Sequence, residues 1–572
     1  GLRPFRVALL SSFSIQMVHD PLVAHGYTEG LALSIYQPGY DQYQQEILDA
    51  NSGLYRGEWD AIVLAVDGTR WAPEIYERFL VGGHKQEAQL VDSVVRRIGD
   101  LIARLRRGCK APLLVHTFAY PSHPALGVLD ATAAAGQRRL ISRVNDGLVA
   151  LSSEHGSVFL VDLQAIVQMV GQDSWYDARL DFMARSPIAR SAFNTLARYY
   201  LRYFRALSGN SRKCLILDLD NTLWGGVVGE EGPLGVALGS EYPGNAFIAF
   251  QRAVLGLRDR GVVLAIASKN NLQDVEAVFA DNPAMQLKLD DFSAKEIHWE
   301  RKSMSVARIA EALNLGMRHV VFADDNLVEC TEVAEAHPGV TVIHLPAKPE
   351  QMVEALLRDG LFDSLQFSDE DTRRAELYRQ REKAEESRAE AGSMEDFCRS
   401  LQMKLYLTGV TSTNVARLSQ MTRKTTQFNA TTRLYTEAEL EDMRRSKEWR
   451  TLAMRVVDKF GDNGIVGLML AHREGDHYNI DTFLMSCRVI NRGIETAMLH
   501  WLGAAARLEG LDALEGWILP TARNMPVRDL YERHGFSLVQ TNDTGQRWRC
   551  TLSANPIDLS DWLEVTDSTS EE

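Results

Sequence analysis

Two carboxylates stand in the middle of the chain, separated by one residue, within the stretch CLILDLDNTLWGG. Four mostly apolar residues run into Asp218, and Asp220 follows. Side chains two positions apart on a strand point to the same side. Two such acids repel each other, so they need a cation such as Mg²⁺, or one of them must hold a proton. One acid can then attack phosphorus while the other moves a proton to or from the leaving group.

Further polar groups follow in the order that a phosphoryl site needs. They are Ser268, Lys269, Asn270, Lys302, Asp324 and Asp325. The first three close a second apolar run, where a hydroxyl and nearby N–H groups could hold phosphate oxygens. The second lysine could neutralise phosphate charge. The last two acids close a third apolar run and could complete the shell of a Mg²⁺ ion.

This ordered set resembles the haloacid dehalogenase (HAD) superfamily over about residues 209–350. The resemblance implies that Asp218 is the nucleophile and Asp220 the general acid/base. The phosphate-binding residues are then Thr222, Ser268, Lys269, Asn270 and Lys302, with Thr222 supporting the loop. The Mg²⁺ ligands are then Asp218, Asp220, Asp324 and Asp325. The alternative is a decayed fold whose acids hold only a structural ion.

Only about 40 residues separate Thr222 from the next expected strand, which leaves no room for a large cap domain. By the same resemblance, capless members act on substrates that another domain or another protein presents.

A second candidate site lies in MSCRVINRGIETAMLHWL, residues 485–502. A basic, glycine-containing turn stands there between an expected strand and helix, and its free N–H groups could cradle an anion. Cys487 precedes the turn. Its thiol lies beside Arg488, Arg492 and a helix N-terminus in sequence, which could lower its pKa and make it nucleophilic. The alternative is a buried core cysteine.

This turn, together with NMPVRDLYERHGF (524–536), resembles the GCN5-related acetyltransferase (GNAT) fold. There, an Arg/Gln-x-x-Gly-x-Gly/Ala turn grips the pyrophosphate of a pantetheine cofactor. Here Asn491 stands where the first glycine belongs. The groove could take coenzyme A or the phosphopantetheine arm of a carrier protein. The residues expected to bind pantetheine or the carrier are Arg488, Arg492, Gly493, Asn524, Arg423 and Lys424, the last two from the basic stretch RKTTQFNATTRLY.

RKTTQFNATTRLY (423–435) reads as a basic loop and DKFGDNGIVG (458–467) as a hairpin-like turn, and a solvated loop without function is the alternative for each. NMPVRDLYERHGF reads as an amphipathic helix that ends at Gly535. DLDNTLWGG, RKTTQFNATTRLY, DKFGDNGIVG, SCRV and PTARNMPVRDLYERHGF occur in that order. This combination resembles the FkbH-like family. The resemblance implies a glyceryl transferase/phosphatase of polyketide biosynthesis, with 1,3-bisphosphoglycerate as donor and an acyl carrier protein as acceptor. It further implies that Cys487 carries the acyl group while the HAD site removes the remaining phosphate.

Alternating apolar runs and amphipathic stretches predict the elements that must position these residues. The expected strands of the first region are 6–10, 60–66, 111–118 and 157–163, with a helix over 86–107. Those of the second region are 213–220, 262–268, 319–325 and 340–346. Those of the third are 404–410, 451–460, 464–473, 478–490 and 513–520, with a helix over 495–510.

The first region resembles the sheet of an SGNH hydrolase, with Ser11, Ser12 or Ser14 after the first strand. The expected Asp-x-x-His pair is missing, because Ala165 stands in the histidine position. We therefore expect a non-catalytic docking or shielding domain there.

The expected fold is a multidomain α/β chain. Its parts are an SGNH-like α/β domain (1–208), a capless HAD Rossmann-like domain (209–366), a helical linker (367–400), a GNAT-like α+β domain (401–556) and an acidic, frayed tail (557–572).

Composition limits the classes of partner. With 572 residues, the chain is long enough for three or four domains. The net charge of −14 disfavours nucleic acid as the main partner. No apolar run approaches the ~18 residues of a membrane helix, and the N-terminus lacks the pattern of a signal peptide. Six scattered cysteines without a CxxC pair fit a cytoplasmic protein.

Two other functions stay open on the sequence. The chain could be a stand-alone HAD phosphatase for a soluble phosphorylated acid, with a structural GNAT-like domain. It could also be a chemically silent scaffold, although clustered carboxylates are costly without a metal or a reaction. The order of acyl transfer and dephosphorylation, the carrier protein, the final product and the oligomeric state are not readable from the residues.

Overall fold

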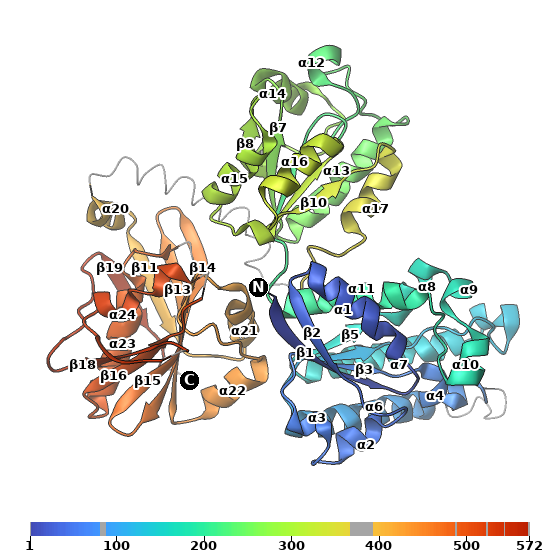
Figure 1. The fold of residues 1–572 in the computed structure, drawn as a ribbon, viewed down its shortest axis with the longest axis horizontal. Helices are drawn as coiled ribbons and strands as arrows, with labels where there is room; N and C mark the ends of the chain where they lie inside the picture. Colours follow the sequence, from blue (N-terminus) through green and yellow to red (C-terminus); the bar gives the residue numbers. More distant parts are fainter. Residues whose placement is uncertain are drawn as a thin grey trace. The chain divides into compact units, whose positions relative to one another are not determined.

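The computed structural model describes residues 2–79, 87–365, 393–486, 489–521, 524–542 and 544–569 (Figure 1). The chain divides into two compact units. The first comprises residues 1–209 with 436–439, and the second comprises 210–435 with 440–572. Most of the predicted linker and the pair Cys487–Arg488 lie outside the described residues.

The first unit is a parallel sheet in the order β2-β1-β3-β4-β5. Its strands are β1 (Arg3–Ser11), β2 (Leu31–Tyr36), β3 (Ala61–Ala65), β4 (Leu113–His116) and β5 (Val158–Val161). Its helices are α1 (His19–Thr28), α2 (Tyr43–Leu48), α3 (Gly53–Arg56), α4 (Gly68–Trp71), α5 (Pro73–Tyr76), α6 (Glu87–Gly108), α7 (Gln137–Glu154), α8 (Leu163–Val170), α9 (Gln172–Trp175), α10 (Ala178–Ala184) and α11 (Ala192–Leu207). Strand β3 is buried at every position, as helices on both faces of a parallel sheet require.

The second unit begins with another parallel sheet, in the order β10-β9-β6-β7-β8. Its strands are β6 (Cys214–Leu217), β7 (Val263–Ser268), β8 (Phe292–Ile297), β9 (Val320–Asp324) and β10 (Thr341–His344). Its helices are α12 (Val228–Glu231), α13 (Gly244–Asp259), α14 (Leu272–Asp281), α15 (Lys302–Ala312), α16 (Leu327–Ala336) and α17 (Met352–Leu357). Alternate residues of β6 enter two different apolar cores, one on each face of the sheet. This is the expected consequence of a strand period of two.

The remainder of the second unit is a nine-stranded, mostly antiparallel sheet. Its strands are β11 (Met403–Thr408), β12 (Phe428–Asn429), β13 (Trp449–Asp458), β14 (Gly461–Glu474), β15 (His477–Met485), β16 (Ala513–Ile518), β17 (Ser537–Thr541), β18 (Gln546–Thr551) and β19 (Leu563–Asp567). The helices in this part of the chain are α20 (Met394–Ser400), α21 (Val415–Lys424), α22 (Glu437–Arg445), α23 (Ile494–Leu508) and α24 (Leu530–Arg533). The predicted turn in DKFGDNGIVG is confirmed as the hairpin that joins β13 to β14.

Strands β15 and β16 pair in parallel only over His477–Ile480, and β12 pairs with the far end of β15. Beside β12, the Ala430 N–H donates to the Phe483 carbonyl, while the Leu519 N–H donates to the Ala430 carbonyl. Residues 428–430 therefore lie between the diverging strands and are buried. The alternative that RKTTQFNATTRLY is a solvated loop is wrong for this part of it.

The acidic tail contains a strand that the sequence reading missed. Strand β19 pairs in parallel with β11, with Leu405 opposite Val565. Leu563 is buried in the main core of this domain. The expectation of a frayed tail is therefore wrong for residues 563–567, because alternating apolar side chains outweighed the acidic composition.

The expected helix over NMPVRDLYERHGF is also divided. A 3-10 turn (Met525–Val527) precedes the single turn of α24. Pro526 supplies no N–H for a longer helix. Gly535 has a φ of 77°, as a residue that ends a helix requires.

None of the helices in the described ranges has the length and apolar character needed to cross a bilayer.

Candidate functional site

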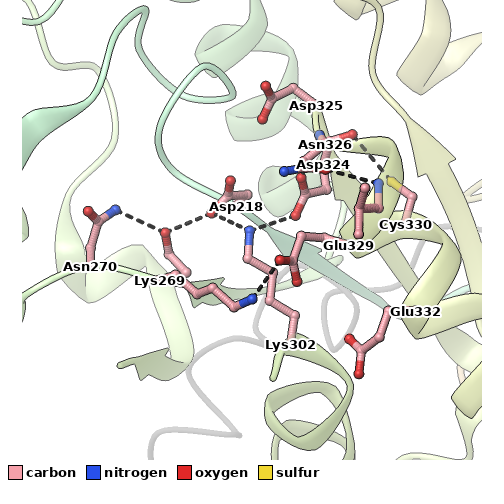
Figure 2. Close-up of polar contacts among 12 residues, drawn as sticks. Asp218, Lys269, Asn270, Lys302, Asp324, Asp325, Asn326, Glu329, Cys330 and Glu332 are labelled. Atoms are coloured by element: carbon pink, nitrogen blue, oxygen red, sulfur yellow. Dashed lines mark hydrogen bonds and ion pairs between the residues drawn. The ribbon is translucent and has the colours of Figure 1, made fainter. Parts of the chain in front are cut away.

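The carboxyl ends of three neighbouring strands bring the predicted phosphoryl residues together (Figure 2). Asp218 follows β6, Ser268 ends β7 and Asp324 ends β9. Lys302, the first residue of α15, approaches from the next crossover. Parallel sheets place their ligand sites at this edge, so the sequence order becomes one cluster in space.

Lys302 connects the two strand-end acids. Its Nζ lies 2.9 Å from Asp218 Oδ1 and 2.7 Å from Asp324 Oδ2. All three side chains are buried, with Asp324 at 0% exposed. From the other side, the Ser268 hydroxyl donates to Asp218 Oδ1 at 2.7 Å, and Asn270 Nδ2 donates to the Ser268 hydroxyl at 3.1 Å.

Burial is the largest influence on the pKa values of the acids in this cluster. It raises the pKa of Asp324 to about 6, with the charge of Asp218 acting in the same direction and Lys302 opposing it. Burial also raises the pKa of Asp325, again with Asp218 adding to the effect. Burial disfavours the charge on Lys302, but the two carboxylates beside it raise its pKa overall. Additional positive charge would therefore stabilise the acids.

Asp218, Asp324 and Asp325 form a candidate cation site. One carboxylate oxygen from each lies within 4.8 Å of the others, and among the described residues no second such group occurs. Three hard oxygen donors suit Mg²⁺, which keeps part of its water shell. The donor set and the raised pKa values of two members fit this ion.

The sequence predicts that Asp220 binds the cation, but its side chain makes other contacts. Its Oδ1 accepts from the Trp224 indole N–H at 2.8 Å and from the Val228 backbone N–H at 3.1 Å. Its carboxylate is not part of the candidate cation site, so the prediction that it is a metal ligand is wrong for the side chain. Burial raises the pKa of Asp220, opposed by the hydrogen bonds from Trp224, Val228 and the Asn270 side chain.

Two other predicted phosphate residues, Thr222 and Lys269, differ in their surroundings from Ser268 and Lys302. Thr222 is fully buried, and its hydroxyl has no hydrogen-bond partner within the part of the chain that the structure describes. Lys269 pairs with Glu329 at 2.6 Å rather than with the acid cluster. For Thr222, the prediction of phosphate contact is wrong, because no surface of its side chain reaches solvent. Lys269 would have to leave Glu329 before it could contact phosphate.

The sequence reading missed Trp224. It is fully buried, and its ring makes an edge contact with Phe279. A left-handed Asn221 (φ 53°) turns the chain back after Asp220, so that a residue four positions on can donate to that acid. The signal was the tryptophan in DNTLWGG, since a buried indole needs an acceptor.

For the predicted acyl-transfer site, the structure brings fewer of the named residues together than for the phosphoryl site. Cys487 and Arg488 lie outside the described residues. Arg492 is 9% exposed, and its guanidinium lies 3.3 Å from Asp458. Asn524 is 0% exposed and donates at 3.0 Å to the carbonyls of Asn429 and Leu519. The predicted pantetheine contact of Asn524 is wrong, because its amide holds the chain beside β12.

Arg423 and Lys424 are half-buried in the last turn of α21. They lie on a helix end, not in the open loop that the sequence reading placed there.

A comparison with family models identifies the first unit. Residues 6–201 match the model of the FkbH N-terminal domain. This part of the chain is similar to that domain. The predicted resemblance to the FkbH-like family is thereby confirmed. No curated protein matches the sequence.

Solved structures match more of the chain than residues 6–201. The N-terminal part of a Bacteroides fragilis protein, which contains a phosphatase domain complexed with Mg, is 28% identical. The match covers 64% of this chain and 96% of that chain, with a TM-score of 0.59. The chain therefore shares the fold of a phosphatase-containing protein over its α/β part.

Two further solved structures, an acetyltransferase and a GNAT domain, match a smaller share of the chain. The ribosomal-protein-S18-alanine N-acetyltransferase of Escherichia coli is 13% identical, over 27% of this chain and 96% of that chain, with a TM-score of 0.21. The GNAT domain of S. lividans PAT is 15% identical, over 26% and 89%, with a TM-score of 0.22.

Proposed function

We propose that the chain is a glyceryl transferase/phosphatase. It would take the glyceryl unit of 1,3-bisphosphoglycerate, remove its remaining phosphate and leave it as a thioester on the phosphopantetheine arm of an acyl carrier protein in polyketide biosynthesis. The observation that carries the proposal is the buried cluster of Asp218, Ser268, Lys302 and Asp324, in a chain whose residues 6–201 also match the FkbH N-terminal domain.

The domains take separate roles in this proposal. Residues 1–208 would be an SGNH-like docking domain without catalysis, and residues 209–366 the HAD-like phosphatase. Residues 367–400 would be a helical linker and residues 401–556 the GNAT-like acyltransferase. The enzyme would work in the cytoplasm.

The acyl step joins a thiol to an acyl phosphate. The Cys487 thiolate would attack the carbonyl carbon, form a thioester and release inorganic phosphate with the electron pair of the broken C–O bond. The pantetheine thiol of the carrier would then attack that thioester and return Cys487 to its thiolate. No oxidant or reductant is needed.

The phosphatase step uses the α/β site. Asp218 would attack the phosphorus of the 3-phosphate, while Oδ2 of Asp220 delivers a proton to the departing alcohol oxygen. Asp220 would then take a proton from the water that attacks the aspartyl phosphate, which releases inorganic phosphate. Ser268 and Lys302, which both contact Asp218, would hold the phosphoryl oxygens. Mg²⁺ held by Asp218, Asp324 and Asp325 would offset the charge that builds up on those oxygens.

Intact-mass spectrometry of a holo carrier protein tests the proposal. After incubation with 1,3-bisphosphoglycerate, Mg²⁺ and the full chain, the carrier should gain a glyceryl group without phosphate. Asp218→Asn should instead leave a phosphoglyceryl adduct, and Cys487→Ser should give no adduct. If the wild-type chain leaves every three-carbon acyl phosphate unreacted, the transferase proposal is wrong.

A stand-alone phosphatase is the second candidate. This candidate is favoured because the whole acid cluster lies within residues 218–325 of one domain. In that case phosphate release from a soluble phosphorylated acid should be indifferent to carrier protein and to Cys487→Ser.

A further inference from the structure

The turn before α23 is the expected anion cradle of the C-terminal domain. Gly493 is the residue that begins the helix, with a left-handed φ of 85°. The expected pattern has glycine or alanine at two positions two residues apart. If Gly493 is the second of the pair, Asn491 replaces the first; if Gly493 is the first, Glu495 replaces the second. Either way the turn departs from the pattern.

Glu495 lies in the first turn of α23, directly after the glycine turn. It is the second residue of α23, is 3% exposed, and its Oε2 has no partner among the described residues. Burial raises the pKa of its carboxyl, while hydrogen bonds from its own backbone N–H and that of Asn491 lower it. The Glu495 carboxylate thus accepts from backbone N–H groups of the turn and the helix start that could otherwise bind an external anion.

Arg492, the arginine of the turn, already has partners within the protein. Arg492 pairs with Asp458 at 3.3 Å, and its guanidinium lies 5.8 Å from the centre of the Phe397 ring. Asp458 itself accepts from the backbone N–H groups of Phe460 and Gly461 in the β13–β14 hairpin. Turning Arg492 toward a phosphate would therefore leave a buried carboxylate without its cation, which is costly.

The C-terminal segment covers the turn from outside. The Trp562 indole N–H donates to the Arg492 carbonyl at 3.2 Å. A Cβ on Gly493 would lie 3.1 Å from the Ser560 hydroxyl. The close approach of residues 560–562 leaves this side of the turn occupied by protein.

We propose that Glu495 takes the place of the pyrophosphate at this turn, so that the domain rejects the nucleotide of coenzyme A. A dianionic pyrophosphate would meet a buried acid and an arginine already paired. Pantetheine on a carrier protein has a single phosphodiester and no nucleotide, so it does not need this cradle. The identity of the acceptor rests on the proposed function, whereas the exclusion of coenzyme A does not.

Calorimetric titration of the full chain tests the exclusion. The wild type should show no saturable binding of coenzyme A up to about 1 mM, and Glu495→Ala should bind it at least about tenfold more tightly. Glu495→Gln removes the charge but keeps the volume, so its affinity should fall between the two. Glu564→Ala, an exposed acid of β19, should behave like the wild type. Pantetheine, which lacks the pyrophosphate, should not distinguish the variants.

Either of two results would overturn the proposal. One is saturable binding of coenzyme A to the wild type with a Kd below about 100 µM. The other is a Glu495→Ala chain that melts at the wild-type temperature but binds coenzyme A no better. Neither measurement uses a glyceryl donor, so a failure of glyceryl transfer would leave this result standing.

Discussion

Asp218 and Asp220 differ in their contacts, and that difference predicts different losses. Asp218 contacts Lys302 and Ser268 inside the cluster, whereas one oxygen of Asp220 is fixed by Trp224. Removing a covalent nucleophile leaves no alternative route, so Asp218→Asn should abolish hydrolysis of a soluble phosphate monoester. Asp220→Asn should lower kcat by about 10²–10⁴-fold, the usual cost of losing a general acid. Steady-state phosphate assays of the two variants check the order; equal losses would contradict the assignment.

Trp224 fixes the orientation of the acid. Because Oδ1 of Asp220 accepts two N–H groups, its proton must be carried by Oδ2. Trp224→Phe removes one donor and keeps an aromatic ring. We expect kcat for an alkyl phosphate to fall about tenfold or more, since its leaving group needs a proton. Aryl phosphates with good leaving groups should be much less affected.

A loss that is equal for alkyl and aryl phosphates would show that Trp224 only supports the fold. Trp501→Phe is the matched control, because it removes another indole donor, in this case to Asp567 in the C-terminal domain. Its activity toward both classes of substrate should equal that of the wild type.

At the scale of elements, β19 closes one edge of the large sheet. Leu563 is buried in the core of that sheet, whereas its neighbour Glu564 pairs with Lys404 at the surface. Leu563→Ala should cost about 2–5 kcal/mol of unfolding free energy. Glu564→Ala should cost at most about 1 kcal/mol. Urea unfolding of both variants checks the difference, and similar midpoints would mean that β19 contributes no packing.

The central parallel strands were predictable because they are short, mostly apolar runs that end in polar residues. The run before Asp218 and the run that ends at Ser268 are examples: both predicted strands are confirmed, with bounds that differ by up to three residues. The same pattern predicts the position of the site, since consecutive parallel strands end at the same edge.

Other elements and contacts could not be predicted from the sequence, because they depend on residues that are distant along the chain. Strand β12 is two residues long, and only the gap between β15 and β16 makes Phe428 and Asn429 a strand. Strand β8 has a half-exposed, polar pattern that resembles a loop. The commitment of Arg492 to Asp458 likewise joins residues 34 positions apart, and nothing in the turn itself indicates it.

At the scale of the whole molecule, each unit contains a histidine that is buried uncharged. Burial lowers the pKa of His116 in the first unit and of His319 in the second to about 3. An unfolded histidine titrates near 6.5, so below that pH the unfolded chain binds protons that the folded chain cannot. Stability should therefore be complete above about pH 6.5 and fall toward pH 3, by at most about 1.4 kcal/mol per pH unit for each histidine.

Urea midpoints of the full chain at pH 7.5 and pH 5 measure this loss. His116→Gln should reduce the pH dependence, because one of the two groups no longer titrates. A midpoint that is unchanged between the two pH values in the wild type would contradict the prediction.

Lys302 acts as a counterion of the protein's own between Asp218 and Asp324. The acids are thus partly neutralised before any metal arrives, so we expect the domain to fold without a metal. Chelation with EDTA should stop hydrolysis of a phosphate monoester yet shift the melting temperature by less than about 2 °C. A cell short of Mg²⁺ would keep the protein intact but idle, and activity would return with the ion, without refolding.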